Sequence, residues 1–175
     1  MRGRRILGID PGSGRVGHGL IELINGQPSL IGHGVIETTV NAPQTQKLSH
    51  IYERMVALIN EIRPDLIAVE MIFFARNTST AFSVGQARGV ILLAAAQANI
   101  EIAEIAPLKL KKVLLGHGGA KKKDIQFFIR DYFKISKETK LGDDAADAVA
   151  IALCQVFMLD PDAPLAPGQV KILIS

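Results

Sequence analysis

The chain has 175 residues, a formal net charge of +3 and 48% hydrophobic residues, values that predict a single globular domain and exclude a disordered chain. A single cysteine, Cys154, excludes a disulfide framework and is typical of a reducing, cytoplasmic setting. The longest unbroken apolar run, Val90–Ala96, is far too short to cross a bilayer, so we expect no membrane segment.

The first forty residues predict a three-stranded antiparallel meander. The runs Ile6–Asp10, Val16–Ile24 and Leu30–Thr39 have the apolar and β-branched residues typical of strands. Asp10 is followed by Pro-Gly, which indicates a turn. Asn25-Gly26, between the second and third runs, is a strong hairpin signal.

The pattern then changes to helices that alternate with strands. Apolar residues at spacings of three and four over Leu48–Ile62 predict an amphipathic helix. The elements expected after it are strands at Leu66–Glu70 and Ile100–Ile105 and helices at Thr78–Ala98, Leu108–Leu115, Lys121–Phe133 and Asp144–Phe157. This order predicts an α/β fold, with a mixed five-stranded sheet of three antiparallel and then parallel strands, flanked by helices.

The chain end differs in composition from the rest. Pro161, Pro164 and Pro167 lie among small residues, after the expected end of the last helix. We therefore expect residues 1–158 to form the folded domain and residues 159–175 to be a flexible tail.

Four carboxylates are placed where the predicted fold brings them to one edge of the sheet. Asp10 and Glu70 each end a strand, and α/β sheets place their sites at such ends. Asp144 and Asp147 lie on one face of the last helix. Asp10 alone could be a turn former and Asp144 alone a helix cap. Four converging carboxylates repel one another, so together they predict two Mg²⁺ or Mn²⁺ ions and phosphodiester hydrolysis.

A group of lysines lies in a segment that holds no acidic residue. Three glycines and His117 divide it into two clusters, and glycine lets backbone N–H groups approach an anion closely. The alternative is a solvated helix face, the usual explanation of a charge run. We predict a phosphate-binding surface formed by Lys109, Lys111, Lys112, Lys121, Lys122 and Lys123.

Four segments of the chain resemble the motifs of the RuvC family, bacterial Holliday junction resolvases with a ribonuclease H-like fold. They are Ile6–Ser13, Val69–Asn77, Gly85–Val90 and Asp144–Ala148, and the resemblance extends from about Ile6 to about Phe157. It implies a homodimer that binds a four-way DNA junction and nicks two opposed strands of like polarity, in recombination and repair. It also implies a branch-migration motor complex as a partner.

The resemblance also implies roles for particular residues. Asp10, Glu70, Asp144 and Asp147 match the family's catalytic, metal-binding acids, and some members carry His at the position of Asp144. We expect Asp10 to bridge two metal ions, Glu70 and Asp147 to complete one ion's shell each, and Asp144 to be a further ligand or to orient the attacking water. Lys122 is expected to stabilise charge on the phosphate. The expected DNA-binding residues are Phe73, which matches an aromatic residue placed against unpaired bases, and Arg76, Asn77, Lys111, Lys121, Lys122 and Lys123.

The two-fold symmetry of a four-way junction matches a dimer of the same symmetry. The helix expected at Thr78–Ala98 is rich in small residues, and we predict that it forms the dimer interface. Its alternative is a wholly internal helix, because helices that are apolar all round are also found in cores.

Three other functions remain open at this point. The first is a ribonuclease H-like nuclease that acts on RNA, which the Asp10-Pro-Gly start would fit. The second is an ATP-binding module of the actin and sugar-kinase type, but such proteins have two lobes and 175 residues hold only one. The third is a junction-binding protein without catalysis, which the presence of all four acids disfavours.

Overall fold

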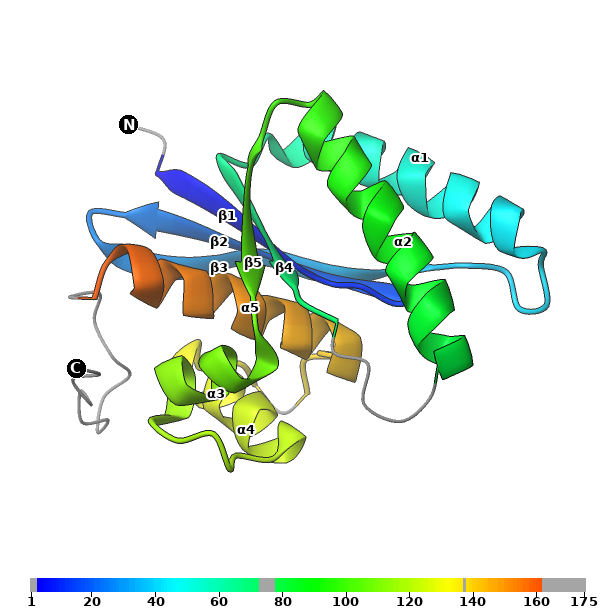
Figure 1. The fold of residues 1–175 in the computed structure, drawn as a ribbon. Helices are drawn as coiled ribbons and strands as arrows, with labels where there is room; N and C mark the ends of the chain where they lie inside the picture. The colour runs from blue at the N-terminus through cyan, green and yellow to red at the C-terminus, as the bar shows by residue number, and fades with distance from the viewer. Residues whose placement is uncertain (1–2, 73–77, 137, 162–175) are drawn as a thin grey trace.

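The structure is a computed structural model that describes residues 3–72, 78–136 and 138–161. In this part of the chain a five-stranded sheet lies between two groups of helices (Figure 1). The strands are β1 (Arg4–Asp10), β2 (Arg15–Ile24), β3 (Gln27–Glu37), β4 (Leu66–Glu70) and β5 (Glu101–Ile105). The helices are α1 (Gln44–Ile62), α2 (Thr78–Gln97), α3 (Pro107–Leu115), α4 (Lys122–Tyr132) and α5 (Asp143–Leu159).

The antiparallel meander predicted from the sequence is confirmed. β1 pairs with β2, and β2 pairs with β3, both antiparallel. Asn25 and Gly26 make the turn with φ values of 52° and 77°, the left-handed conformations that a two-residue hairpin turn requires. β3 begins at Gln27, directly after this turn, and so earlier than the predicted run.

The mixed sheet is confirmed as well. The strand order is β3-β2-β1-β4-β5, and β4 pairs parallel with both β1 and β5. α1 is the crossover from the meander to β4, and α2 is the crossover from β4 to β5. α1 ends at Ile62, where the left-handed backbone of the C-cap residue Arg63 (φ 50°) and the following Pro64 stop the helix.

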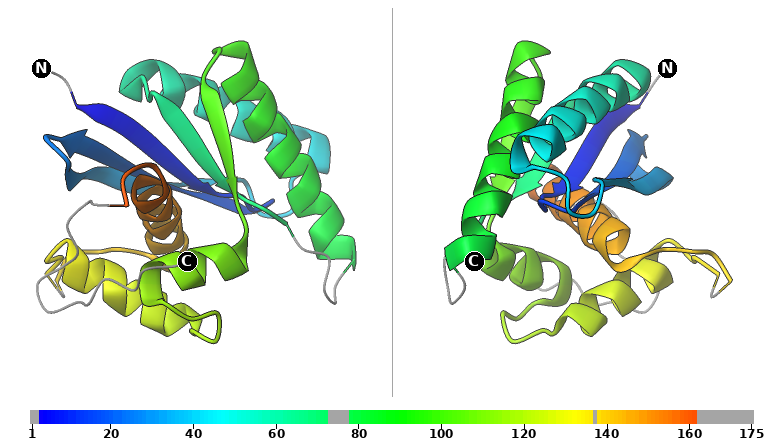
Figure 2. Two further views of the ribbon diagram at one scale, coloured as in Figure 1. Left: turned by 60° about the vertical axis from the view of Figure 1, so that its left-hand side comes forward. Right: turned by 90° about the vertical axis from the view of Figure 1, so that its right-hand side faces the viewer.

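Hydrophobic cores fill both faces of the sheet. α1 and α2 cover one face, where Leu7 and Ile9 of β1 pack against Met55 and Ile91. α5 covers the other face, and α3 and α4 pack on its outer side, as the rotated views in Figure 2 show. α5 is therefore enclosed between the sheet and two short helices, which explains its nearly continuous small and apolar sequence.

α5 lies unusually close to the sheet because three strand residues beneath it are glycines. A Cβ atom added at Gly8 would lie 2.1 Å from the Ala148 carbonyl oxygen, and one added at Gly17 would lie 2.0 Å from that of Asp144. At Gly19 it would meet the side chain of Val149 at 2.5 Å. Any larger residue at these positions would push the helix away from the sheet.

The exposure of α2 bears on one of the alternatives left open by the sequence. α2 is not wholly internal in the single chain, since Phe82 is 68% and Leu93 is 49% exposed. α5 continues to Leu159, one residue past the predicted domain boundary. Most of the predicted tail, residues 162–175, lies outside the described part of the chain, so the tail stays a prediction. None of the described helices has the length and apolar character that a membrane crossing requires.

Candidate active site

Asp10 and Glu70 are brought together by the pairing of two parallel strands. β1 and β4 are in register through Ile9 and Val69, and the next residue of each strand is the acid. Side chains alternate between the two faces of a sheet. Ile6 and Gly8 of β1 face α5, as do Leu66 and Ala68 of β4, so both acids are directed to the α5 face.

Asp144 and Asp147 reach the same edge from the first turns of α5. Gly17 is the cross-strand partner of Asp10, and the backbone of Asp144 lies directly above Gly17. The close packing of α5 on this glycine therefore places its N-terminal acids beside the acid of β1. The structure brings the four predicted carboxylates to one region of the molecule.

Burial and mutual repulsion change the acidity of the two strand acids. Burial raises the pKa of Asp10 to about 7, with further contributions from the negative charges of Glu70, Asp147 and Asp144. Burial likewise raises the pKa of Glu70 to about 7, with a contribution from Asp147. Near neutral pH the folded protein thus holds two carboxyl groups that resist ionisation, a frequent property of functional sites.

Lys122 forms an ion pair with one of the four acids. Its Nζ lies 2.5 Å from Oδ2 of Asp147. Burial acts to lower the pKa of Lys122, but the hydrogen bond and charge of Asp147 and the charge of Asp10 outweigh it, so the pKa is raised. Lys111 lies near enough to oppose the rise in the pKa of Glu70. Lys121 and Lys123 are exposed at the start of α4, on either side of Lys122.

Two arginines contact the candidate site, and neither was singled out from the sequence as a site residue. The Nε atom of Arg15 lies 2.8 Å from Oδ2 of Asp144. The Nε–H of Arg88 donates a hydrogen bond to the backbone carbonyl oxygen of Glu70, 3.2 Å away. The available signals were the position of Arg15 at the start of β2 and the place of Arg88 in the Gly85–Val90 motif. Phe73, Arg76 and Asn77 lie outside the described residues.

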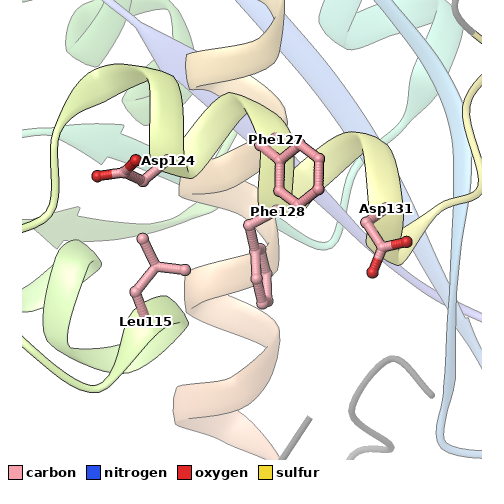
Figure 3. A pocket seen from close by; sticks show the side chains of 5 residues that line it. All are labelled: Leu115, Asp124, Phe127, Phe128 and Asp131. Atoms are coloured by element: carbon pink, nitrogen blue, oxygen red, sulfur yellow. The ribbon is translucent and has the colours of Figure 1, made fainter. Parts of the chain in front are cut away.

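A pocket of about 310 Å³ beside α4 is separate from the four carboxylates of the candidate site. Figure 3 shows its lining, which is Leu115, Asp124, Phe127, Phe128 and Asp131. Phe127 is 74% exposed there, while Phe128 packs into the core around α5. None of the predicted site residues contributes to this pocket.

The chemistry of the carboxylates fits a divalent cation. Hard cations prefer carboxylate oxygens, and a cation would relieve the repulsion that raises the pKa of Asp10 and Glu70. Among the described residues, no group of three or more acidic, His or Cys side chains is assembled as a metal site. Asp144 is paired with Arg15 and Asp147 with Lys122 in this structure.

Comparison with known proteins decides the family. The model of the crossover junction endodeoxyribonuclease RuvC family matches residues 6–155. The chain belongs to the RuvC family. Named RuvC proteins from Thermotoga petrophila and Chloroflexus aurantiacus are 47% and 44% identical to it over 153 residues, which is 87% of this chain and 92% and 93% of theirs. RuvC proteins are nucleases that act on DNA and depend on metal ions.

Solved RuvC structures have the same fold. RuvC of Thermus thermophilus superposes with a TM-score of 0.80 at 30% identity, covering 92% of this chain and 99% of that one. The same protein in complex with a Holliday junction substrate gives a TM-score of 0.79 at 28% identity. The predicted ribonuclease H-like, α/β fold and the predicted family are therefore confirmed, and the comparisons favour DNA over RNA as the substrate.

Proposed function

We propose that this RuvC protein resolves four-way DNA junctions by paired, symmetric nicks, and that Asp10, Glu70, Asp144 and Asp147 carry out the hydrolysis. The observation that carries this proposal is the placement of Asp10 and Glu70. They are neighbours at the carboxyl ends of two parallel strands, on the face that α5 covers, and both have a pKa of about 7. Structural carboxylates would not be expected at such a costly position.

The four acids would hold two Mg²⁺ or Mn²⁺ ions, and Asp10 interacts electrostatically with the other three acids. Bound cations supply an activated water and stabilise the leaving oxygen of the phosphodiester. Asp144 would be a further ligand or would orient the attacking water. Lys122, whose charge is maintained by Asp147, donates hydrogen bonds to the phosphate and stabilises its negative charge.

We further propose that DNA binds along the lysine-rich surface next to these acids. Lys111 and Lys122 interact electrostatically with Glu70, and Lys121 and Lys123 extend the positive charge along the start of α4. Phosphate contacts of this kind give affinity without sequence preference. Phe73 would contact unpaired bases at the crossover, and Arg76 and Asn77 complete the proposed DNA-binding residues.

The assembly proposed is a homodimer with one active site in each subunit, since two symmetric nicks require two sites. The exposed apolar residues of α2, Phe82 and Leu93, support this helix as the interface. Residues 1–158 act as the nuclease domain of each subunit. A branch-migration motor complex is the proposed partner and the cytoplasm the proposed location, because junctions form on chromosomal DNA.

Cleavage of a synthetic four-way junction tests the function. The protein should produce paired nicks at symmetric positions with Mg²⁺ or Mn²⁺, and none with EDTA. Asp10→Asn should lose at least a thousandfold in cleavage rate and still bind the junction, because binding depends on the basic surface. Asp131→Asn is the matched control, since Asp131 pairs with Lys134 at the far end of α4.

Two results would contradict the proposal. Full cleavage by Asp10→Asn would remove the acid site from the mechanism. Cleavage of a structured RNA but not of the DNA junction would favour the RNA nuclease instead.

A further inference from the structure

Arg88 joins α2 to the ends of two strands at the candidate active site. Its Nε–H donates to the carbonyl oxygen of Glu70 at the end of β4, 3.2 Å away. Its second guanidinium nitrogen, Nη2, pairs with Oε2 of Glu104 on β5. The side chain of Arg88 is only 18% exposed, whereas that of Glu104 is 50% exposed. A largely buried guanidinium thus contacts β4 and β5 at the same time.

The hydrogen bond reaches Glu70 from the side opposite to its carboxylate. The side chain of Glu70 is directed to the α5 face, with Asp10 and Asp147, whereas α2 covers the other face of the sheet. Arg88 therefore holds the backbone of Glu70 without touching its carboxylate. Fixing the carbonyl group limits rotation of the last peptide unit of β4, and this limits the direction of the Glu70 side chain.

The chemistry of arginine suits this double contact. A guanidinium is planar, permanently charged and able to donate in two directions at once, whereas the ammonium of lysine is a single point charge. Glu104 balances the charge and orients the plane, which leaves the Nε–H for the Glu70 carbonyl. If Arg88 served only to connect α2 to β5, the ion pair with Glu104 would be enough, and the hydrogen bond to Glu70 would not be needed.

We propose that Arg88 is a positioning residue for the metal-binding acid Glu70. The inference rests on the proposed function of Glu70, and it gives a role to the Gly85–Val90 motif, to which the mechanism assigned none. Loss of the hydrogen bond frees the strand end and weakens metal binding by tenfold or more, the range typical of residues that orient metal ligands. Saturating metal restores part of the cleavage rate, with kcat lowered and KM for the junction unchanged.

The test measures Mn²⁺ binding to the full-length protein without DNA, by electron paramagnetic resonance of the free ion. The variants are Arg88→Lys and Arg88→Met, with Glu70→Gln as the benchmark for loss of the acid itself. Arg4→Met is the matched control, because Arg4 pairs with Glu101 at the opposite end of β5, 3.3 Å away. Thermal unfolding and light scattering on each variant report stability and oligomeric state.

The expected result is a tenfold or greater loss of Mn²⁺ affinity in both Arg88 variants and in Glu70→Gln, with Arg4→Met unchanged. Arg88→Lys separates positioning from folding, since it keeps the charge opposite Glu104 and should lose affinity with little change in melting temperature. Normal Mn²⁺ affinity in the Arg88 variants, with loss in Glu70→Gln, overturns the inference alone. Normal affinity in Glu70→Gln overturns the proposed metal site as well. Arg88 variants that bind Mn²⁺ normally but change oligomeric state would assign Arg88 to an interface instead.

Discussion

At the scale of single residues, the candidate site is a source of instability in the metal-free protein. Burial is the largest cause that raises the pKa of Asp10, followed by the charges of Glu70, Asp147 and Asp144. A raised pKa means that the folded protein binds this proton more tightly than the unfolded chain does. The acid therefore favours folding while protonated and opposes it once ionised.

This linkage predicts a pH dependence of stability. Asp10 contributes stability below its unfolded pKa of 3.8, and this contribution is lost as the pH rises through the folded pKa of about 7. A shift of about three units corresponds to about 4 kcal/mol at most. In EDTA, Asp10→Asn should match the wild type near pH 4 and be more stable than it by about 2–4 kcal/mol at pH 8.

Urea unfolding between pH 4 and pH 8 measures this difference. Asp131→Asn is the control and should follow the wild type throughout, because Asp131 lies outside the site. Added Mn²⁺ should stabilise the wild type at pH 8 and not Asp10→Asn, since the ion binds ionised carboxylates of the folded state. A constant difference between Asp10→Asn and the wild type at all pH values would contradict the linkage.

The four acids could be found from the sequence because the pattern of apolar residues around each one shows its place in a strand or helix. Asp10 and Glu70 end apolar strands, and Asp144 and Asp147 share one helix face. Arg15 and Arg88 could not be found in this way. Each arginine has a long side chain that contacts a residue on another element, distant in sequence. The local sequence does not show in which direction such a side chain extends.

At the scale of secondary structure elements, the distance between α5 and the sheet sets the geometry of the site. α5 carries two of the acids and β1 carries a third, so a shift of the helix changes their separation directly. Gly17 decides this distance at the N-terminal end of α5, because a Cβ atom there would lie 2.0 Å from the Asp144 carbonyl oxygen. The backbone of a packed helix cannot move aside to make room for an added atom, whereas the end of a flexible side chain can.

Gly17→Ala should therefore displace the first turn of α5 and impair the site more than the fold. We expect a loss of cleavage of a hundredfold or more and a destabilisation of about 1–3 kcal/mol from overpacking. Gly32→Ala on the neighbouring strand β3 is the matched control, since nothing lies within 4 Å of its added Cβ atom. Junction cleavage and urea unfolding measure both effects, and equal behaviour of the two variants would contradict the argument.

Most helices and strands could be predicted because the residue patterns that indicate them are local. The difference at the start of β3 has a local cause as well. The strand β3 starts at Gln27 and includes Pro28, whereas the run predicted from the sequence began at Leu30. Because β3 is an edge strand, proline is tolerated in it without loss of the sheet's inner hydrogen bonds. The strand order β3-β2-β1-β4-β5 is not visible in any single segment, and the sequence predicted a mixed sheet without predicting this order.

At the scale of the whole molecule, the face of α2 that points away from the sheet has no partner within the described part of the chain. Phe82, Gly85, Gly89 and Leu93 lie along this face at helical spacing, and a Cβ atom added at either glycine would meet nothing within 4 Å. The sequence could not distinguish this face from a buried one, because α2 is apolar all round. An apolar, glycine-lined face suits close packing with a second copy of the same helix.

The double variant Phe82→Glu, Leu93→Glu should consequently be monomeric. Two charges placed at a self-complementary interface meet their own copies, so each substitution acts twice and the repulsion adds to the lost apolar contact. Light scattering measures the oligomeric state, and the junction assay should show single, unpaired nicks. Phe127→Glu is the matched control, because Phe127 is a phenylalanine of similar exposure on α4, away from this face. A dimeric double variant, or a monomeric Phe127→Glu, would move the interface away from α2.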